Sequence, residues 1–209
     1  MDPTHSAHQI TTAEQLAALF GPVGEASVRK EVAYLHPHYC ALIAASPFAI
    51  LATSGPGGLD ASPRGDAPGF VVVENSTTLL LPERRGNNRA DSLHNLLADP
   101  RMALLFLIPG LGETLRVNGS ARISVEPALL QRFVVQGQPP KCVLVVTVDA
   151  VFFQCARAIQ RSALWRGLAA DRPAGLPSPG TILSALADAG INAEKYDREL
   201  PERQRNTLY

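Results

Sequence analysis

Short apolar runs, each closed by a cluster of turn residues, fill the sequence between residues 48 and 154 and restrict what the chain can fold into. The first run, 48–53, ends at a Gly- and Pro-rich turn over 54–58, which predicts a hairpin whose return strand covers 59–66. The strand segments do not alternate regularly with long helices, as a doubly wound nucleotide-binding fold would require. The pattern therefore favours antiparallel strands joined by tight turns.

The remaining strands and the helices follow from changes of hydrophobic period along the chain. Further strands are predicted at 70–73, 77–81, 102–107, 114–124 and 142–154, and the last is a β-branched run that we expect to be buried on both faces. Helices are predicted at 12–20, 34–45, 89–97, 126–135, 156–165 and 181–189. Asn88 is expected to cap the helix at 89–97. These elements describe a mainly β (α+β) fold, an antiparallel barrel with flanking helices.

The composition excludes several classes of partner. Nineteen Lys and Arg residues balance nineteen Asp and Glu residues, so neither nucleic acid nor an anionic membrane surface is an expected partner. The longest apolar runs are shorter than the roughly 20 residues of a membrane-spanning helix. The N-terminus has no basic start followed by an apolar stretch, and we therefore expect a cytoplasmic protein.

A Pro- and Gly-rich stretch at 171–179 marks a linker near the end of the chain. Three regions are expected: an N-terminal helical segment at 1–45, a barrel domain at 46–166, and a linker with a C-terminal helical tail at 167–209. Hydrophobic residues make up 46% of the chain and charged residues 18%, a composition typical of a folded protein.

The cysteines and histidines give only weak signals. Cys40, Cys142 and Cys155 are three in number and widely spaced, which fits neither a disulfide framework nor a zinc site, so we expect reduced thiols. His36 and His38 lie close to Cys40, but a single local trio is a poor metal motif, and no metal is predicted. No set of nucleophile, base and orienting residue is recognisable.

The block at 81–89, Leu-Pro-Glu-Arg-Arg-Gly-Asn-Asn-Arg, is the most informative in the sequence. Its three arginines gather just before and at the start of a predicted helix, whose free N–H groups and positive dipole end favour an anion. Arginine adds charge-assisted, often bidentate hydrogen bonds. The block is typical of a phosphate site, although a solvated basic turn with Asn88 as a simple helix cap would give the same pattern.

Two other blocks carry polar residues at every second position. Asp60, Ser62, Arg64 and Asp66 would project from one face of a strand, and so would Thr114, Arg116 and Asn118 on another strand, because side chains alternate across a sheet. Each set could be the outward polar face of its strand. Inside a barrel or at a dimer interface the same groups would need a ligand or one another as hydrogen-bond partners.

These blocks, in this order, resemble the flavoproteins related to pyridoxamine 5'-phosphate oxidase, and in particular a subgroup known only as FMN-dependent enzymes. The resemblance covers about residues 30 to 166 and rests on matches at 46–48, 52–53, 60–70, 86–89, 105–106, 109–110, 113–119, 155–156, 161–162 and 164–165. Several motifs in fixed order are far more specific than a lone glycine motif.

The resemblance implies a six-stranded antiparallel split β-barrel that forms a homodimer, with FMN bound at the subunit interface by both chains. The flavin ring would lie against the strand that carries Ser62 and Arg64, and the phosphate would be held around Asn88 and Arg89 with help from Arg84 or Arg85. The partner chain would supply Thr114, Arg116 and Trp165. The full set of implied FMN-binding residues is Ser62, Arg64, Gly65, Leu81, Pro82, Arg84, Arg85, Asn87, Asn88, Arg89, Thr114, Arg116 and Trp165.

The function implied is that of an FMN-dependent oxidoreductase with a small-molecule electron donor and acceptor. The substrate stays open, because the residues that grip pyridoxamine phosphate in the true oxidase are not recognisable, and its oxidation is not predicted. The chain departs from the subgroup at Arg85, where proline is usual, and at Gln154 and Arg157, where histidine and lysine are usual. The alternative is a non-catalytic module that stores or senses flavin or haem on the same barrel.

Overall fold

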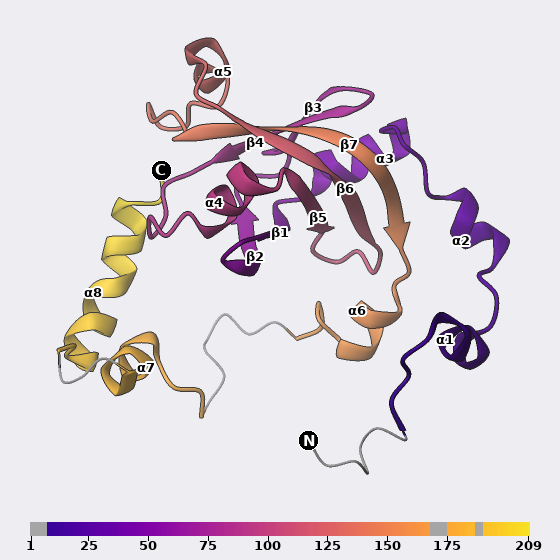
Figure 1. Ribbon diagram of the computed structural model, residues 1–209. Coiled ribbons are helices and arrows are strands. Elements are labelled where there is room, and N and C mark those ends of the chain that lie inside the picture. The colour runs from indigo at the N-terminus through magenta and orange to yellow at the C-terminus, as the bar shows by residue number, and fades with distance from the viewer. Residues whose placement is uncertain (1–7, 168–174, 187–189) are drawn as a thin grey trace.

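The computed structural model describes residues 8–167, 175–186 and 190–209 and is organised around one antiparallel sheet (Figure 1). The strand order is β2-β1-β5-β6-β7-β4-β3. The strands are β1 (Phe48–Gly55), β2 (Gly58–Gly65), β3 (Val72–Asn75), β4 (Thr78–Glu83), β5 (Arg101–Leu107), β6 (Thr114–Ser124) and β7 (Cys142–Gln154). The expectation of a mainly antiparallel β fold with flanking helices is confirmed. The sheet has seven strands, however, and not six, and it stays open because β2 and β3 are its two edges.

The strand β7 occupies the predicted range 142–154 and joins the two halves of the sheet. It pairs with β4 only from Cys142 to Thr147, whereas it pairs with β6 along nearly its whole length. Burial on both faces holds only for the first part of the strand, and both Thr147 and Asp149 are exposed. The prediction fails from Thr147 onward, where the pairing with β4 ends and one face of β7 lies open to solvent.

The core lies on the concave side of the sheet, where every second residue points inward. Leu51, Leu104 and Leu115 come from adjacent strands and are at most 1% exposed. Burial of each such side chain contributes about 1.5–3 kcal/mol. The helix α4 (Asp91–Ala98) packs against β1 and β2. It is held by Asn95, whose Nδ2 donates to Thr53 Oγ1 at 3.2 Å and to the Gly58 carbonyl at 3.3 Å.

The N-terminal helices largely follow the sequence pattern. In α1 (Ala13–Phe20) the side chain of Thr12 accepts from the Gln15 N–H, and the Gln15 side chain bonds back, which forms a capping box. The helix α3 (Pro37–Ala45) begins three residues later than predicted, because His36 Nδ1 accepts from the His38 N–H and caps it. A short helix between them, α2 (Glu25–Arg29), was not predicted, since five residues carry no clear period.

The later helices depart further from expectation. Both α5 (Pro127–Gln131) and α6 (Arg157–Ser162) are shorter than predicted. The helix α7 (Pro179–Leu186) matches the start of the helix expected at 181–189, but residues 187–189 and linker residues 171–174 lie outside the described chain. The polar helix α8 (Ala193–Asn206), which contains Pro201, was not predicted. None of the described helices has the length and apolar character needed to span a bilayer.

The predicted hairpin at 70–81 is shifted along the chain. Its strands are β3 and β4, and the turn lies at Ser76-Thr77. As a result β4 runs two residues further than expected and ends at Glu83, which is only 8% exposed. This extension delivers a carboxylate to the end of the strand, directly before the arginine block.

Candidate functional site

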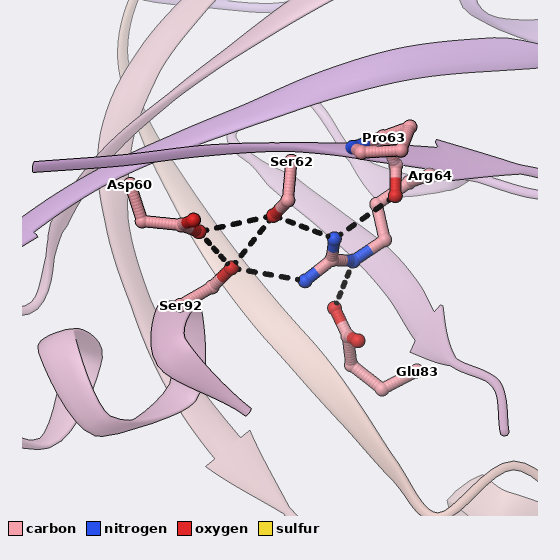
Figure 2. A network of polar contacts seen from close by, with 6 residues as sticks. All are labelled: Asp60, Ser62, Pro63, Arg64, Glu83 and Ser92. Carbon is pink, nitrogen blue, oxygen red and sulfur yellow. Dashed lines mark hydrogen bonds and ion pairs between the residues drawn. The ribbon is translucent and has the colours of Figure 1, made fainter. Parts of the chain in front are cut away.

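An ion pair joins two strands from opposite ends of the sheet. Arg64 lies on the edge strand β2, and Glu83 ends β4, which stands next to the other edge. Arg64 Nε lies 2.6 Å from Glu83 Oε1, and the two side chains are 16% and 11% exposed (Figure 2). The sheet therefore curls until its ends approach, and the pair closes the gap that no backbone ladder bridges.

The polar face of β2 points toward this gap. Asp60, Ser62 and Arg64 alternate along the strand, as predicted, and the Ser92 hydroxyl at the start of α4 meets them (Figure 2). Arg64 donates to Ser62 Oγ at 2.9 Å and to Ser92 Oγ at 3.2 Å. Both hydroxyls donate to Asp60 Oδ2, at 3.0 and 2.5 Å. This network fixes the direction of the guanidinium.

A second ion pair repeats the connection with the charges exchanged. Arg84 Nε lies 3.0 Å from Asp66 Oδ2, and Arg84 Nη1 donates to the Phe133 carbonyl at 2.6 Å. The Tyr209 hydroxyl donates to the other oxygen of Asp66 at 2.9 Å. Figure 1 shows the end of the chain lying beside β4 and α4. The Arg84 side chain is thus held between the barrel and the C-terminal tail.

The buried groups have shifted proton affinities. Burial raises the pKa of the Glu83 carboxyl, and the positive charge of Arg64 opposes the shift. Burial, with a smaller effect from the Glu83 charge, raises the pKa of the Cys142 thiol to about 11. Cys142 therefore stays a thiol at neutral pH and is a poor nucleophile. Cys40, Cys142 and Cys155 are all free, as expected for reduced thiols.

The loop at 86–90 has an unusual backbone. Asn88 and Ala90 both take left-handed conformations, with φ of 62° and 54°, on either side of Arg89. The helix α4 starts at Asp91 with Ala90 as its N-cap, so the prediction that Asn88 caps a helix starting at residue 89 is wrong. The Asn87 side chain instead accepts from the Arg89 N–H at 3.1 Å. The left-handed residues therefore shift the start of the helix to Asp91.

A cavity of about 860 Å³ lies between β2, the end of β4 and the start of α4. Its wall includes most of the residues that the sequence assigned to FMN: Ser62, Arg64, Gly65, Pro82, Arg84, Arg85, Asn87, Asn88 and Arg89. Leu81 does not line it, because the side chain is fully buried in the core. Residues separated by more than 20 positions in sequence thus converge on one site.

The other predicted residues lie elsewhere in the same chain. The Thr114 hydroxyl donates to Gln154 Oε1 at 3.2 Å, and the Arg116 guanidinium lies 5.8 Å from the centre of the Phe152 ring. Trp165 Nε1 donates to the Leu111 carbonyl at 2.7 Å. Neither these two polar side chains nor the tryptophan lines the cavity.

Some residues of the site were missed by sequence reasoning. Glu83 entered the sequence analysis only as one residue of the basic block. The available signal was that each arginine has an acidic residue close to it in the sequence, Glu83 next to Arg84 and Asp66 near Arg64. In the structure these acids are exchanged, so that Glu83 pairs with Arg64 and Asp66 pairs with Arg84. Lys141 and Tyr209 also line the cavity, and no local sequence pattern indicates that these two residues belong to the site. Among the described residues, no group of His, Cys, Asp and Glu is arranged to hold a metal ion.

Solved structures of similar shape come from several bacteria. HupZ of Group A Streptococcus shares 18% identity over 57% of this chain and 94% of its own, with a TM-score of 0.48. An FMN-binding protein from Syntrophomonas wolfei shares 14% identity over 55% and 82%, with a TM-score of 0.43. A FAD-binding protein from Mesorhizobium loti shares 12% identity over 58% and 96%, with a TM-score of 0.39.

Sequence comparison gives a firmer assignment. No curated protein matches the chain. The sequence model of the family described as pyridoxamine 5'-phosphate oxidase matches residues 35–155, which contain every strand of the sheet and the greater part of the cavity wall. The resemblance seen in the polar blocks is thereby confirmed: this chain belongs to the pyridoxamine 5'-phosphate oxidase family.

Proposed function

We propose that this protein is an FMN-dependent oxidoreductase that acts on a small molecule. The observation that supports the proposal most is the convergence of Ser62, Arg64 and the 84–89 block on one cavity. Its volume, about 860 Å³, falls within the range of roughly 300–1,000 Å³ typical of small-molecule sites. Pyridoxamine phosphate oxidation itself is not proposed.

The loop at 86–90 fits the phosphate end of FMN. Arg89 extends from it and is 74% exposed at its side chain, so the guanidinium is free to turn toward an anion. The first N–H groups of α4 lack partners within the helix, and the helix dipole favours negative charge at this end. Arg89 now pairs with Asp91 at 2.9 Å, and a phosphate would have to compete with that carboxylate.

The wall formed by β2 fits the ring end. Arg64 is oriented by Ser62, Ser92 and Glu83, and Phe70 and Leu93 add apolar surface to the same cavity. FMN when bound would supply hydride and electron transfer, while the protein sets orientation, charge and access of water. With FMN bound, Arg64, or Arg116 from the partner chain, would be the cation that stabilises negative charge on the reduced ring.

A homodimer is part of the proposal, because the outer face of the sheet is apolar. Ile50 faces Leu105 across β1 and β5, and Phe48 faces Leu107 in the same ladder. These side chains point away from the buried residues of their strands, and Phe48 is 38% exposed. Arg116 lies opposite Leu105 on this face. A second copy docked here would cover the apolar surface and bring Thr114, Arg116 and Trp165 to a neighbouring cavity.

The cofactor is tested by the visible absorption spectrum of the purified protein and by mass spectrometry of the molecule released on denaturation. Flavin bands with released FMN are the expected result. Released FAD would keep the flavin and correct its identity. A colourless protein that also fails to bind added FMN would overturn the proposal.

Catalysis is tested separately from binding. Under anaerobic conditions, NADH, NADPH and dithionite are offered as donors, and the rate at which the reduced flavin returns its electrons to oxygen, quinones and nitro-compounds is then followed. Sustained turnover with a donor and acceptor pair supports an oxidoreductase. Flavin that is bound but never turned over across the panel favours a non-catalytic flavin module.

The dimer is tested by light scattering of the Leu105→Glu variant, with Val125→Glu as a control at an exposed apolar residue outside the β1–β5 face. Leu105→Glu is expected to yield monomers with weakened FMN binding, whereas Val125→Glu should remain dimeric. A wild-type protein that is monomeric and still binds FMN tightly would remove the partner chain from the site.

A further inference from the structure

A second, smaller pocket opens beside the flavin cavity, where the C-terminal tail meets the barrel. It has a volume of about 80 Å³ and is lined by Arg84, Arg85, Gln138, Pro139, Lys141 and Tyr209. Four of these residues, Arg84, Arg85, Lys141 and Tyr209, line the large cavity as well. The two spaces adjoin, so a molecule in the large cavity can extend one group into the small one.

The charge of the small pocket is unbalanced. Its lining side chains include three cations and no carboxylate. Arg84 is neutralised by Asp66 at 3.0 Å. In the described part of the chain, however, neither Arg85 nor Lys141 lies within ion-pair distance of an acidic side chain. Two uncompensated cations on one small hollow create a local positive potential that favours an anion.

The pocket walls are fixed by contacts on both sides. The Lys141 N–H donates to the Glu83 carbonyl at 2.9 Å, which holds Lys141 next to the arginine block as β4 ends. Tyr209 is held by its hydrogen bond to Asp66, and its ring centre lies 5.5 Å from the Arg84 guanidinium. Asp66 therefore anchors Arg84 and Tyr209 together, and Arg85 and Lys141 remain available to a ligand.

The size of the pocket limits what it can take. With about 80 Å³ against about 860 Å³ for the adjoining cavity, the pocket suits a single phosphate- or carboxylate-sized group. Gln138 adds an amide that can donate to an anionic oxygen. The loop at 86–90 already offers the proposed FMN phosphate a separate place, which leaves this pocket for another anion.

We propose that the pocket formed by Arg85, Lys141, Gln138 and Tyr209 is an anion subsite that binds a phosphate or carboxylate group of the substrate beside the flavin. The identity of the anion as part of the substrate rests on the proposed flavin function. The binding of an anion rests only on the residues of the pocket. The electron donor or acceptor is accordingly a small molecule with at least one anionic group.

The subsite is tested by titrating the full-length protein, with and without saturating FMN, with inorganic phosphate and with acetate at low ionic strength. Calorimetry and phosphorus NMR line widths report binding. Compared with wild type, the K141Q variant is expected to bind phosphate at least about 10-fold more weakly, with unchanged FMN affinity, and R85Q is expected to weaken phosphate binding as well. The matched control is Arg122→Gln, which removes an exposed strand arginine that lines neither cavity.

The possible outcomes separate the proposed anion subsite from the proposed flavin function. Phosphate that competes with FMN, with both affinities falling together in K141Q, would assign the pocket to the flavin phosphate and overturn the subsite while the proposed function stands. Equal weakening by Arg122→Gln, or no phosphate binding at all, would also overturn it. If the protein binds no flavin but binds phosphate through Arg85 and Lys141, the subsite stands and the proposed function fails. Circular dichroism melts verify that the variants are folded.

Discussion

Arg64 and Glu83 face each other at 2.6 Å although their strands stand near opposite ends of the sheet. Neither strand pairs with the other through its backbone, so the contact is made by side chains alone. The same pair lines the large cavity. Arg64 and Glu83 therefore serve both the closure of the barrel and the charge of the candidate flavin site.

Removal of one partner of this pair should destabilise the protein strongly. Glu83→Ala leaves a guanidinium buried without its carboxylate, and we expect the free energy of unfolding to fall by about 3 kcal/mol. Replacement of both residues by methionine should recover most of that loss. Glu74→Ala is the control, because its pair with Arg132 is about 40% exposed on each side and is expected to contribute less than about 1 kcal/mol. Urea unfolding gives all these values, and equal losses at the two sites would contradict the prediction.

The buried Glu83 carboxyl should also make stability depend on pH. Its pKa is raised above the ordinary 4.5 in the folded protein, so between these two values the folded state binds more protons than the unfolded state. Its contribution is fully present below pH 4.5 and is lost as the pH rises through the folded pKa. The difference in unfolding free energy between wild type and Glu83→Gln should therefore decline over this window and then level off. A difference that does not change with pH would refute the shift.

The charges beside Arg64 should change the midpoint potential of the proposed FMN. Glu83→Gln removes a negative charge beside Arg64, which leaves the cation free to stabilise the reduced flavin. We expect the midpoint potential to rise by about 30 mV, which for a two-electron couple corresponds to about 1.4 kcal/mol. Arg64→Gln should lower it. Spectroelectrochemical titration measures both, and a potential indifferent to the two changes would place the ring away from β2.

Arg89 and Asp91 should act on FMN binding in opposite directions. Arg89→Ala removes a charge-assisted phosphate contact from an exposed side chain, so the FMN dissociation constant should rise about 10-fold, near the lower end of such effects. Asp91→Asn releases Arg89 from its present partner and should tighten binding. Arg101→Ala is a close control, because the Arg101 side chain is similarly exposed and pairs with a carboxylate two residues away, at Asp99. Fluorescence titration of apo-protein distinguishes the three.

The left-handed conformation of Ala90 should lower the free energy of unfolding by a measurable amount. A residue with a Cβ loses about 1–2 kcal/mol in this conformation, while glycine loses roughly 0.5–1 kcal/mol of backbone entropy. Ala90→Gly is therefore expected to stabilise the protein by up to about 1 kcal/mol, whereas Ala41→Gly, in the middle of α3, should destabilise it by about 1 kcal/mol. Destabilisation at both positions would show that the Ala90 methyl group contributes packing that outweighs the strain.

Much of the fold could be predicted because hydrophobic period is a local property. The range of β7 was visible as a continuous β-branched run, and the common face of Asp60, Ser62 and Arg64 as an alternation of polar residues, although the direction of that face stayed open. The start of α4 was not, because alanine at position 90 gives no sign that its backbone will turn left-handed. The approach of Tyr209 to Asp66 depends on tertiary packing across 143 residues of chain, which no local pattern encodes.

For the candidate site, too, only local sequence patterns could be recognised in advance. The arginine block predicts an anion site, because clustered charge can be recognised in the sequence, and that site remains a prediction. The ion pairs of Arg64 and Arg84 were not predicted, because their carboxylates, on Glu83 and Asp66, lie 18 or 19 positions away in the sequence. The assignment of Thr114, Arg116 and Trp165 to a partner's cavity remains a prediction.

The place of β7 in the sheet has a consequence for biosynthesis. The strands β4 and β6 find their common neighbour only in residues 142–154, so the hairpin that ends in Glu83 cannot join the rest of the sheet until that segment has left the ribosome. Pairings over such distances form slowly and leave strand edges exposed in the nascent chain. The cavity is thus among the last parts of the molecule to form, and binding of the proposed FMN would have to follow the completion of the barrel.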